Sequence, residues 1–78
     1  MSEKRTLAEI AREIRGNWAE VNFAAKPYLF AMSQLGSVDN WYCQESGREI
    51  VLYFLANAGT WRGETARRVK AELKGMLK

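Results

Sequence analysis

The sequence predicts an all-α protein, a compact single-domain bundle of about four helices with an apolar third helix at its centre. Two Ser/Thr-x-x-Glu pairs, which are typical of helix N-termini, each precede an apolar stretch. The 78-residue chain has one proline and six glycines, a composition that argues against disorder and against a loop-rich scaffold. A chain of this length forms a single domain, so we expect one helical unit over residues 1–78.

The first predicted helix begins at Thr6, because Thr6 and Glu9 have the spacing of a capping box. Apolar residues then share an arc of about 100° on a helical wheel: Leu7, Ile10, Ala11, Ile14, Trp18 and Val21. Phe23 lies off this arc, so we expect the helix to end near Asn22. The acidic residues are expected on its outer face, where carboxylates keep ordinary pKa values: Glu9, Glu13 and Glu20.

A second helix is expected to begin at Pro27, whose fixed φ suits the first helical position, and to stop at Gly36. Its apolar residues share one side: Tyr28, Leu29, Ala31, Met32 and Leu35. Phe30 points away from that side. Residues 37–46, SVDNWYCQES, form either a short turn of helix or an ordered loop, and the pattern leaves both open.

The third predicted helix follows a second capping box, Ser46 with Glu49. Residues 50–56 then run without a polar break, for which a strand is the rival interpretation on composition alone. The capping box and a glycine stop at Gly59 favour a helix, which we place at the centre because it is apolar nearly all round. Thr60 is expected to cap a fourth helix with this inward face: Ala66, Val69, Leu73, Met76 and Leu77.

The composition excludes several classes of site. Histidine is absent and Cys43 is the single cysteine, which essentially excludes a tetrahedral zinc site and the Ser-His-Asp and Cys-His nucleophiles. We therefore predict a protein that is not an enzyme and that has no metal or cofactor, and we expect the Cys43 thiol to be buried and inert. No apolar run approaches the ~20 residues that span a bilayer, and the N-terminus lacks the apolar centre of a signal peptide. We expect a cytoplasmic protein without a membrane partner.

The net charge of +3 is concentrated in the last quarter of the chain. Residues 59–78 carry six basic and two acidic side chains, whereas the other 58 residues carry six basic and seven acidic ones. Four cations fall within an arc of about 80° on a helical wheel: Arg67, Lys70, Lys74 and Lys78. Arg68 and Arg62 flank this arc. Such a stripe can follow a phosphate backbone. A solvated helix face that complements the macrodipole is the alternative.

The aromatic residues divide into two groups. Trp18 and Phe54 are expected in the core, and Trp61 at the start of the fourth helix, packed over the third. The remaining group has no obvious inward position: Phe30, Trp41 and Tyr42. These three side chains either plug an open end of the bundle or, with Arg62, anchor a partner, as exposed aromatic and arginine side chains often do at interfaces.

The strings IVLYFLANA and TWRGETARR are distinctive together. They belong to a run from AMSQLGS to the final lysine, over which the chain resembles small proteins encoded by phages and mobile elements of Gram-positive bacteria. The resemblance implies a context and no site residues: such proteins often bind and redirect host machinery, an anti-CRISPR-like inhibitor being one example. Because this chain is basic, a DNA-mimic mechanism is disfavoured.

Two functions follow from these observations. The first is a non-enzymatic helical binding protein that occupies a surface of a larger host protein or ribonucleoprotein complex. The alternative is a nucleic-acid-binding module that contacts phosphates through the basic C-terminal helix: Arg67, Arg68, Lys70, Lys74 and Lys78.

Overall fold

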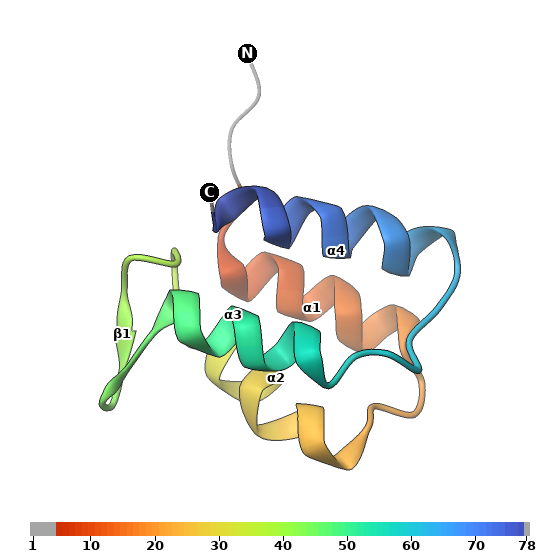
Figure 1. Cartoon of the computed structure of the whole chain (residues 1–78), viewed down its shortest axis with the longest axis horizontal. Helices are drawn as coiled ribbons and strands as arrows, with labels where there is room; N and C mark the ends of the chain where they lie inside the picture. The colour runs from red at the N-terminus through yellow and green to blue at the C-terminus, as the bar shows by residue number, and fades with distance from the viewer. Residues whose placement is uncertain (1–4, 78) are drawn as a thin grey trace.

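The computed structural model describes residues 5–77, and over this range the protein is mostly helical. Four α-helices, a 3-10 turn and a two-stranded antiparallel hairpin follow one another (Figure 1). The elements are α1 (Leu7–Asn17), η1 (Phe23–Ala25), α2 (Lys26–Met32), β1 (Trp41–Tyr42), β2 (Glu45–Ser46), α3 (Gly47–Ala56) and α4 (Glu64–Met76). The predicted helical character is confirmed, and the hairpin corrects the prediction of a purely α-helical bundle.

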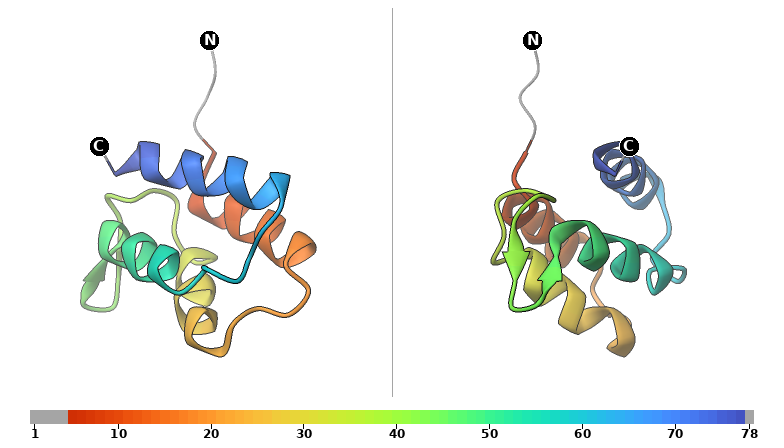
Figure 2. Two further views of the ribbon diagram at one scale, coloured as in Figure 1. Left: turned by 45° about the vertical axis from the view of Figure 1, so that its right-hand side comes forward. Right: turned by 60° about the vertical axis from the view of Figure 1, so that its left-hand side comes forward.

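The helices pack as two neighbouring pairs around a shared core. α4 lies alongside α1, and α3 lies alongside α2, while α1 also contacts α2 (Figures 1 and 2). The hairpin lies at the N-terminal end of α3, and the connection to α4 leaves from the other end of α3. Among residues 5–77, no helix is both long and apolar enough to cross a membrane.

The start of α1 is as predicted and its end is not. Thr6 Oγ1 accepts the Glu9 N–H at 3.0 Å, and Glu9 Oε1 accepts the Thr6 N–H at 2.8 Å, so the capping box is complete. The helix ends at Asn17 rather than near Asn22, because Trp18 takes an extended backbone conformation. Gly16 and Asn17, which are weak helix formers, precede this change of direction. Trp18 remains buried nonetheless.

α2 begins at Lys26, one residue before the predicted start, and Pro27 lies in its first turn, directly after the 3-10 turn η1. Asn22 Oδ1 caps that 3-10 turn by accepting the Ala24 N–H at 3.0 Å. The regular helix ends at Met32, before Gly36. The predicted inward side is confirmed, with Tyr28 half-buried and the others buried: Leu29, Ala31, Met32 and Leu35.

Residues 41–46 form the hairpin, which the sequence did not predict. Trp41 pairs with Ser46 and Tyr42 with Glu45. Cys43 lies at the turn with a φ of 57° and is exposed, so the prediction of a buried thiol is wrong. Side chains at such a two-residue turn project into solvent because no second layer covers them.

The segment before the hairpin is held closely against the start of α3. The Gly47 N–H donates to the Asn40 carbonyl at 2.7 Å. A Cβ at position 47 would lie 2.8 Å from both the Ser37 carbonyl oxygen and Val38 Cα. Only glycine permits this approach of two backbones.

The second capping box, Ser46 with Glu49, opens α3 as predicted. The predicted central position of this helix is wrong, because it packs through one face only. Ile50, Val51 and Phe54 are buried, whereas Leu52 is 54% exposed and Tyr53 also faces solvent. The helix ends at Ala56, before Gly59, where the Asn57 side chain donates to the Tyr53 carbonyl at 2.9 Å.

The fourth helix begins at Glu64, so the prediction that Thr60 caps it is wrong. Gly63 occupies the N-cap position with a φ of 111°, a conformation that favours glycine. On the predicted inward face of α4, Ala66, Val69 and Leu73 are buried. Met76 and Leu77 on the same face are half-buried.

Trp61 lies in the connection between α3 and α4 rather than in a helix, and it is buried. Its ring stacks on Trp18 with centroids 5.7 Å apart, and its indole N–H donates to Asn17 Oδ1 at 2.8 Å. Trp18 in turn meets the edge of Phe54 at 6.2 Å. The predicted core positions of Trp18 and Phe54 are confirmed.

Candidate functional site

The hairpin presents exposed aromatic side chains beside α2. Tyr42, half-buried, meets the ring of Phe30 edge-on with centroids 6.5 Å apart. Phe30 is 50% exposed and Trp41 is 66% exposed. Successive side chains on a strand point to opposite faces, so Trp41 projects from the other side of the hairpin to Tyr42. We call Phe30, Trp41 and Tyr42 the hairpin aromatic cluster.

Trp41 is too exposed to plug an end of the molecule, which decides against that interpretation of the unplaced aromatics. Tyr42 is the exception, because it packs partly against the core. The cluster therefore combines one anchored ring with two rings that offer apolar surface to solvent.

Arg62, which the sequence grouped with these aromatics, lies elsewhere. It follows α3 whereas the hairpin precedes it, so the two regions lie at opposite ends of this helix (Figure 1). Ten helical residues span roughly 15 Å. The structure therefore does not bring Arg62 together with Phe30, Trp41 and Tyr42.

A second apolar area lies on the outward side of α3 and was missed by sequence reasoning. Leu52 and Tyr53 are both exposed there, and the Tyr53 ring packs against Tyr28 with centroids 5.3 Å apart. The available signal was the apolar character of α3 on all sides, which we interpreted as complete burial.

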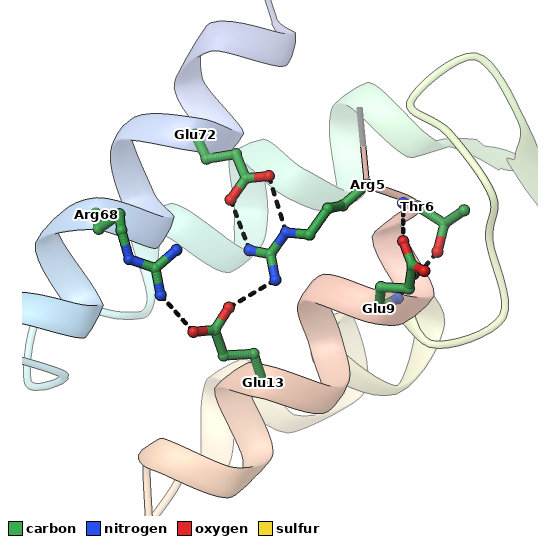
Figure 3. A network of polar contacts seen from close by, with 6 residues as sticks. All are labelled: Arg5, Thr6, Glu9, Glu13, Arg68 and Glu72. Atoms are coloured by element: carbon green, nitrogen blue, oxygen red, sulfur yellow. Dashed lines mark hydrogen bonds and ion pairs between the residues drawn. The ribbon is translucent and has the colours of Figure 1, made fainter. Parts of the chain in front are cut away.

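Arg68, which the sequence places beside the predicted basic stripe, takes part in an ion-pair network between α1 and α4 (Figure 3). Arg68 Nη2 pairs with Glu13, whose other oxygen accepts from Arg5 Nη1 at 2.7 Å. Arg5 also binds Glu72 through two nitrogens, at 3.1 and 2.6 Å. Two arginines and two glutamates thus balance one another, and the Arg68 charge is already compensated.

The same network corrects the prediction for Glu13. Its carboxylate faces α4 rather than open solvent, and hydrogen bonds from Arg5 and then Arg68 lower its pKa from the ordinary value. In the same way, the bidentate bond to Glu72 raises the pKa of Arg5. Glu13 and Arg68 are 55 positions apart in the chain, so no local pattern could have indicated the pair.

Lys70 also departs from the predicted outward direction. Its Nζ donates to the carbonyls of Ala58 and Trp61, both at 2.8 Å, and lies 5.9 Å from the centre of the Trp61 ring. Burial first, and then the charges of Lys74 and Arg62, lower the pKa of Lys70.

Two positions of the predicted stripe keep their predicted exposure, Arg67 and Lys74. Lys78 lies outside the described residues. Among the described residues of the stripe, Arg67 and Lys74 are therefore exposed, whereas Lys70 is half-buried.

Three cationic side chains lie around a hollow beside the connection from α3 to α4. Arg62, Arg67 and Lys70 line this hollow, which has a volume of about 340 Å³, and Trp61 forms part of its wall. We call this hollow, with its three cationic side chains, the basic hollow. No ion pair joins Arg62 or Arg67 to a carboxylate within residues 5–77.

The fold and these surfaces define a small, mostly helical protein with an exposed aromatic cluster at one end of α3 and a basic hollow at the other. No family model, curated protein or solved structure matches the chain.

Proposed function

We propose that this chain is a non-enzymatic binding protein that occupies a surface of a larger partner protein through the hairpin aromatic cluster. The observation that carries the proposal is the exposure of Trp41 and Phe30, at 66% and 50%, on a molecule whose core is already complete without them. Large aromatic side chains are enriched among the few residues that dominate the energy of protein interfaces.

The segment that leads to the hairpin is held by hydrogen bonds from backbone N–H groups to a side-chain oxygen and to a backbone carbonyl. Asn40 Oδ1 accepts the N–H groups of Gly36 and Ser37, both at 3.0 Å. The Arg48 N–H donates to the Val38 carbonyl at 3.1 Å, which ties the approach to the hairpin to α3. Because the hairpin backbone is held in place before binding, association loses less conformational entropy.

The exposed part of Trp41 is large enough to matter for affinity. A tryptophan side chain buries roughly 150–250 Å², and two-thirds of that at about 25 cal/mol/Å² corresponds to roughly 2–4 kcal/mol. These magnitudes suit a protein interface with a few dominant anchors.

The resemblance to phage-encoded and mobile-element-encoded small proteins supports a host protein or ribonucleoprotein complex as the partner. In that setting the chain acts by covering a functional surface of the host complex, as an inhibitor does. This role requires neither a catalytic group nor a cofactor.

The test is affinity purification of the tagged protein from its host, with and without nuclease, for the parent and two variants. Trp41→Ala removes an anchor, and Phe23→Ala is the matched control, because Phe23 is an aromatic residue on η1 that is 87% exposed. We expect one host protein to be retained by the parent and by Phe23→Ala after nuclease treatment. Its affinity for Trp41→Ala should fall about 30-fold or more, the effect of losing an anchor worth at least about 2 kcal/mol.

Two results would contradict the proposal. The first is equal retention by Trp41→Ala and Phe23→Ala. The second is loss of all retained protein on nuclease treatment when retention before treatment is unaffected by Trp41→Ala, which would assign the association to nucleic acid. Salt provides a further check, because an aromatic interface weakens little with salt and binding through several phosphates weakens steeply.

A further inference from the structure

The basic hollow brings three cations together from two parts of the chain. Arg67 and Lys70 are three residues apart on α4 and therefore face the same side of the helix. Arg62 reaches the hollow from the connection that precedes α4. This arrangement is independent of the hairpin aromatic cluster, with which it shares no residue.

Positive charges lie close together in the basic hollow. Two carbonyl bonds hold the Lys70 ammonium group in a half-buried position, where burial first, and then the positive charges of Lys74 and Arg62, lower its pKa. Arg5, Arg48 and Arg68 each have a carboxylate partner. Arg62 and Arg67 have none within residues 5–77, and neither have Arg12 and Arg15. Arg62 and Arg67 differ from those two because they line one hollow together with Lys70, where a bound anion would offset the repulsion between like charges.

We propose that Arg62, Arg67 and Lys70 form a binding site for a phosphate group. A phosphate group carries up to two negative charges and several acceptor oxygens, which suit two guanidinium groups and one ammonium group better than a single carboxylate does. Both arginines are exposed and are free to turn their planar N–H groups toward such a ligand. The volume of about 340 Å³ admits a phosphate group together with part of the molecule that carries it.

The site is suited to phosphate contact and not to reading of bases. The aromatic residue in its wall, Trp61, is 2% exposed and already stacked on Trp18, so its face is not available to a nucleobase. Contacts to phosphate position a nucleic acid without selecting a sequence. The phosphate group therefore belongs either to a small phosphorylated molecule or to a nucleic-acid backbone, bound without sequence preference.

NMR titration of the full chain tests the site with two probes, inorganic pyrophosphate and a single-stranded oligonucleotide without terminal phosphates, at constant ionic strength. The indole N–H of Trp61 and the backbone amides of residues 59–70 report on the hollow. The test variant is the double substitution Arg62→Gln with Arg67→Gln. The matched control is Arg12→Gln with Arg15→Gln, which removes the same charge from two exposed arginines on α1.

We expect saturable shifts at the hollow, with affinity reduced at least about tenfold in the test variant and by less than about threefold in the control. Binding of pyrophosphate alone identifies a small phosphorylated ligand, and tighter binding of the oligonucleotide identifies a nucleic-acid backbone. The absence of saturable shifts with both probes would overturn the proposal. Equal losses in the two double variants would also overturn it, because attraction by net charge would then explain the binding.

Discussion

Leucine-to-alanine substitutions at positions 73 and 52 test how the helices pack. Leu73 on α4 is fully buried, whereas Leu52 on α3 is 54% exposed. Truncation of a buried leucine loses its transfer free energy and leaves a cavity, at a cost of about 2–5 kcal/mol. Leu52→Ala removes less than half as much burial and leaves no enclosed cavity, and alanine is the better helix former. Its cost should be about 1 kcal/mol or less.

Thermal and urea unfolding, followed by circular dichroism, measure the difference. In a domain of this size, 1 kcal/mol shifts Tm by about 4–8 °C. We expect Leu73→Ala to lower Tm by roughly 10–40 °C and Leu52→Ala by no more than about 8 °C. The urea dependence of the unfolding free energy should be unchanged in both variants, because neither alters the surface exposed on unfolding much.

Equal losses at the two positions would refute the packing of α3. Leu52 would then belong to the core, α3 would be covered on all sides, and the outward apolar area with Tyr53 would not exist. A small loss at Leu52 together with weaker partner retention would instead extend the partner-binding surface along α3.

Two further substitutions probe the contacts that join distant parts of the chain. Gly47→Ala places a Cβ 2.8 Å from the backbone at Ser37 and Val38. It should destabilise the protein by about 1–3 kcal/mol in thermal unfolding. The control variant Gly75→Ala, whose Cβ would meet nothing within 4 Å, should not destabilise it. Glu13→Gln should be destabilising at neutral pH, and its difference from the parent should shrink as the pH falls below 4.5. The reason is that the pKa of Glu13 is lowered in the folded protein from 4.5, so its contribution is present above that pH and is lost on protonation of the folded state. A pH-independent difference in urea unfolding would show that the ion pairs do not stabilise the fold.

The helix starts that the sequence predicts correctly are those with local causes. Each capping box needs only two side chains three residues apart, Thr6 with Glu9 and Ser46 with Glu49, and both form in the structure. The inward sides of α1 and α4 likewise follow from helical spacing alone. Pro27 acts through its own backbone, and its place in the first turn of α2 is confirmed.

The features that sequence reasoning missed depend on partners far along the chain. The hairpin has only two residues in each strand, too few for an alternating pattern, and it is fixed by the approach of Val38 to Gly47. The ion pair of Arg68 is a second example: its partner Glu13 lies 55 residues earlier, so no local pattern indicates the pair.

The apolar residues of α3 connect the fold to the proposed functions. One face of this apolar helix packs into the core, and Leu52 and Tyr53 on the other face are exposed. The helix therefore has more apolar side chains than the core packing requires. The same helix separates the hairpin aromatic cluster from the basic hollow, which share no residue and no hydrogen bond. Variants at one site should therefore leave the other unperturbed, since distant sites without shared partners act additively. Loss of partner binding and loss of phosphate binding can thus be assigned separately, and either proposal can fail without the other.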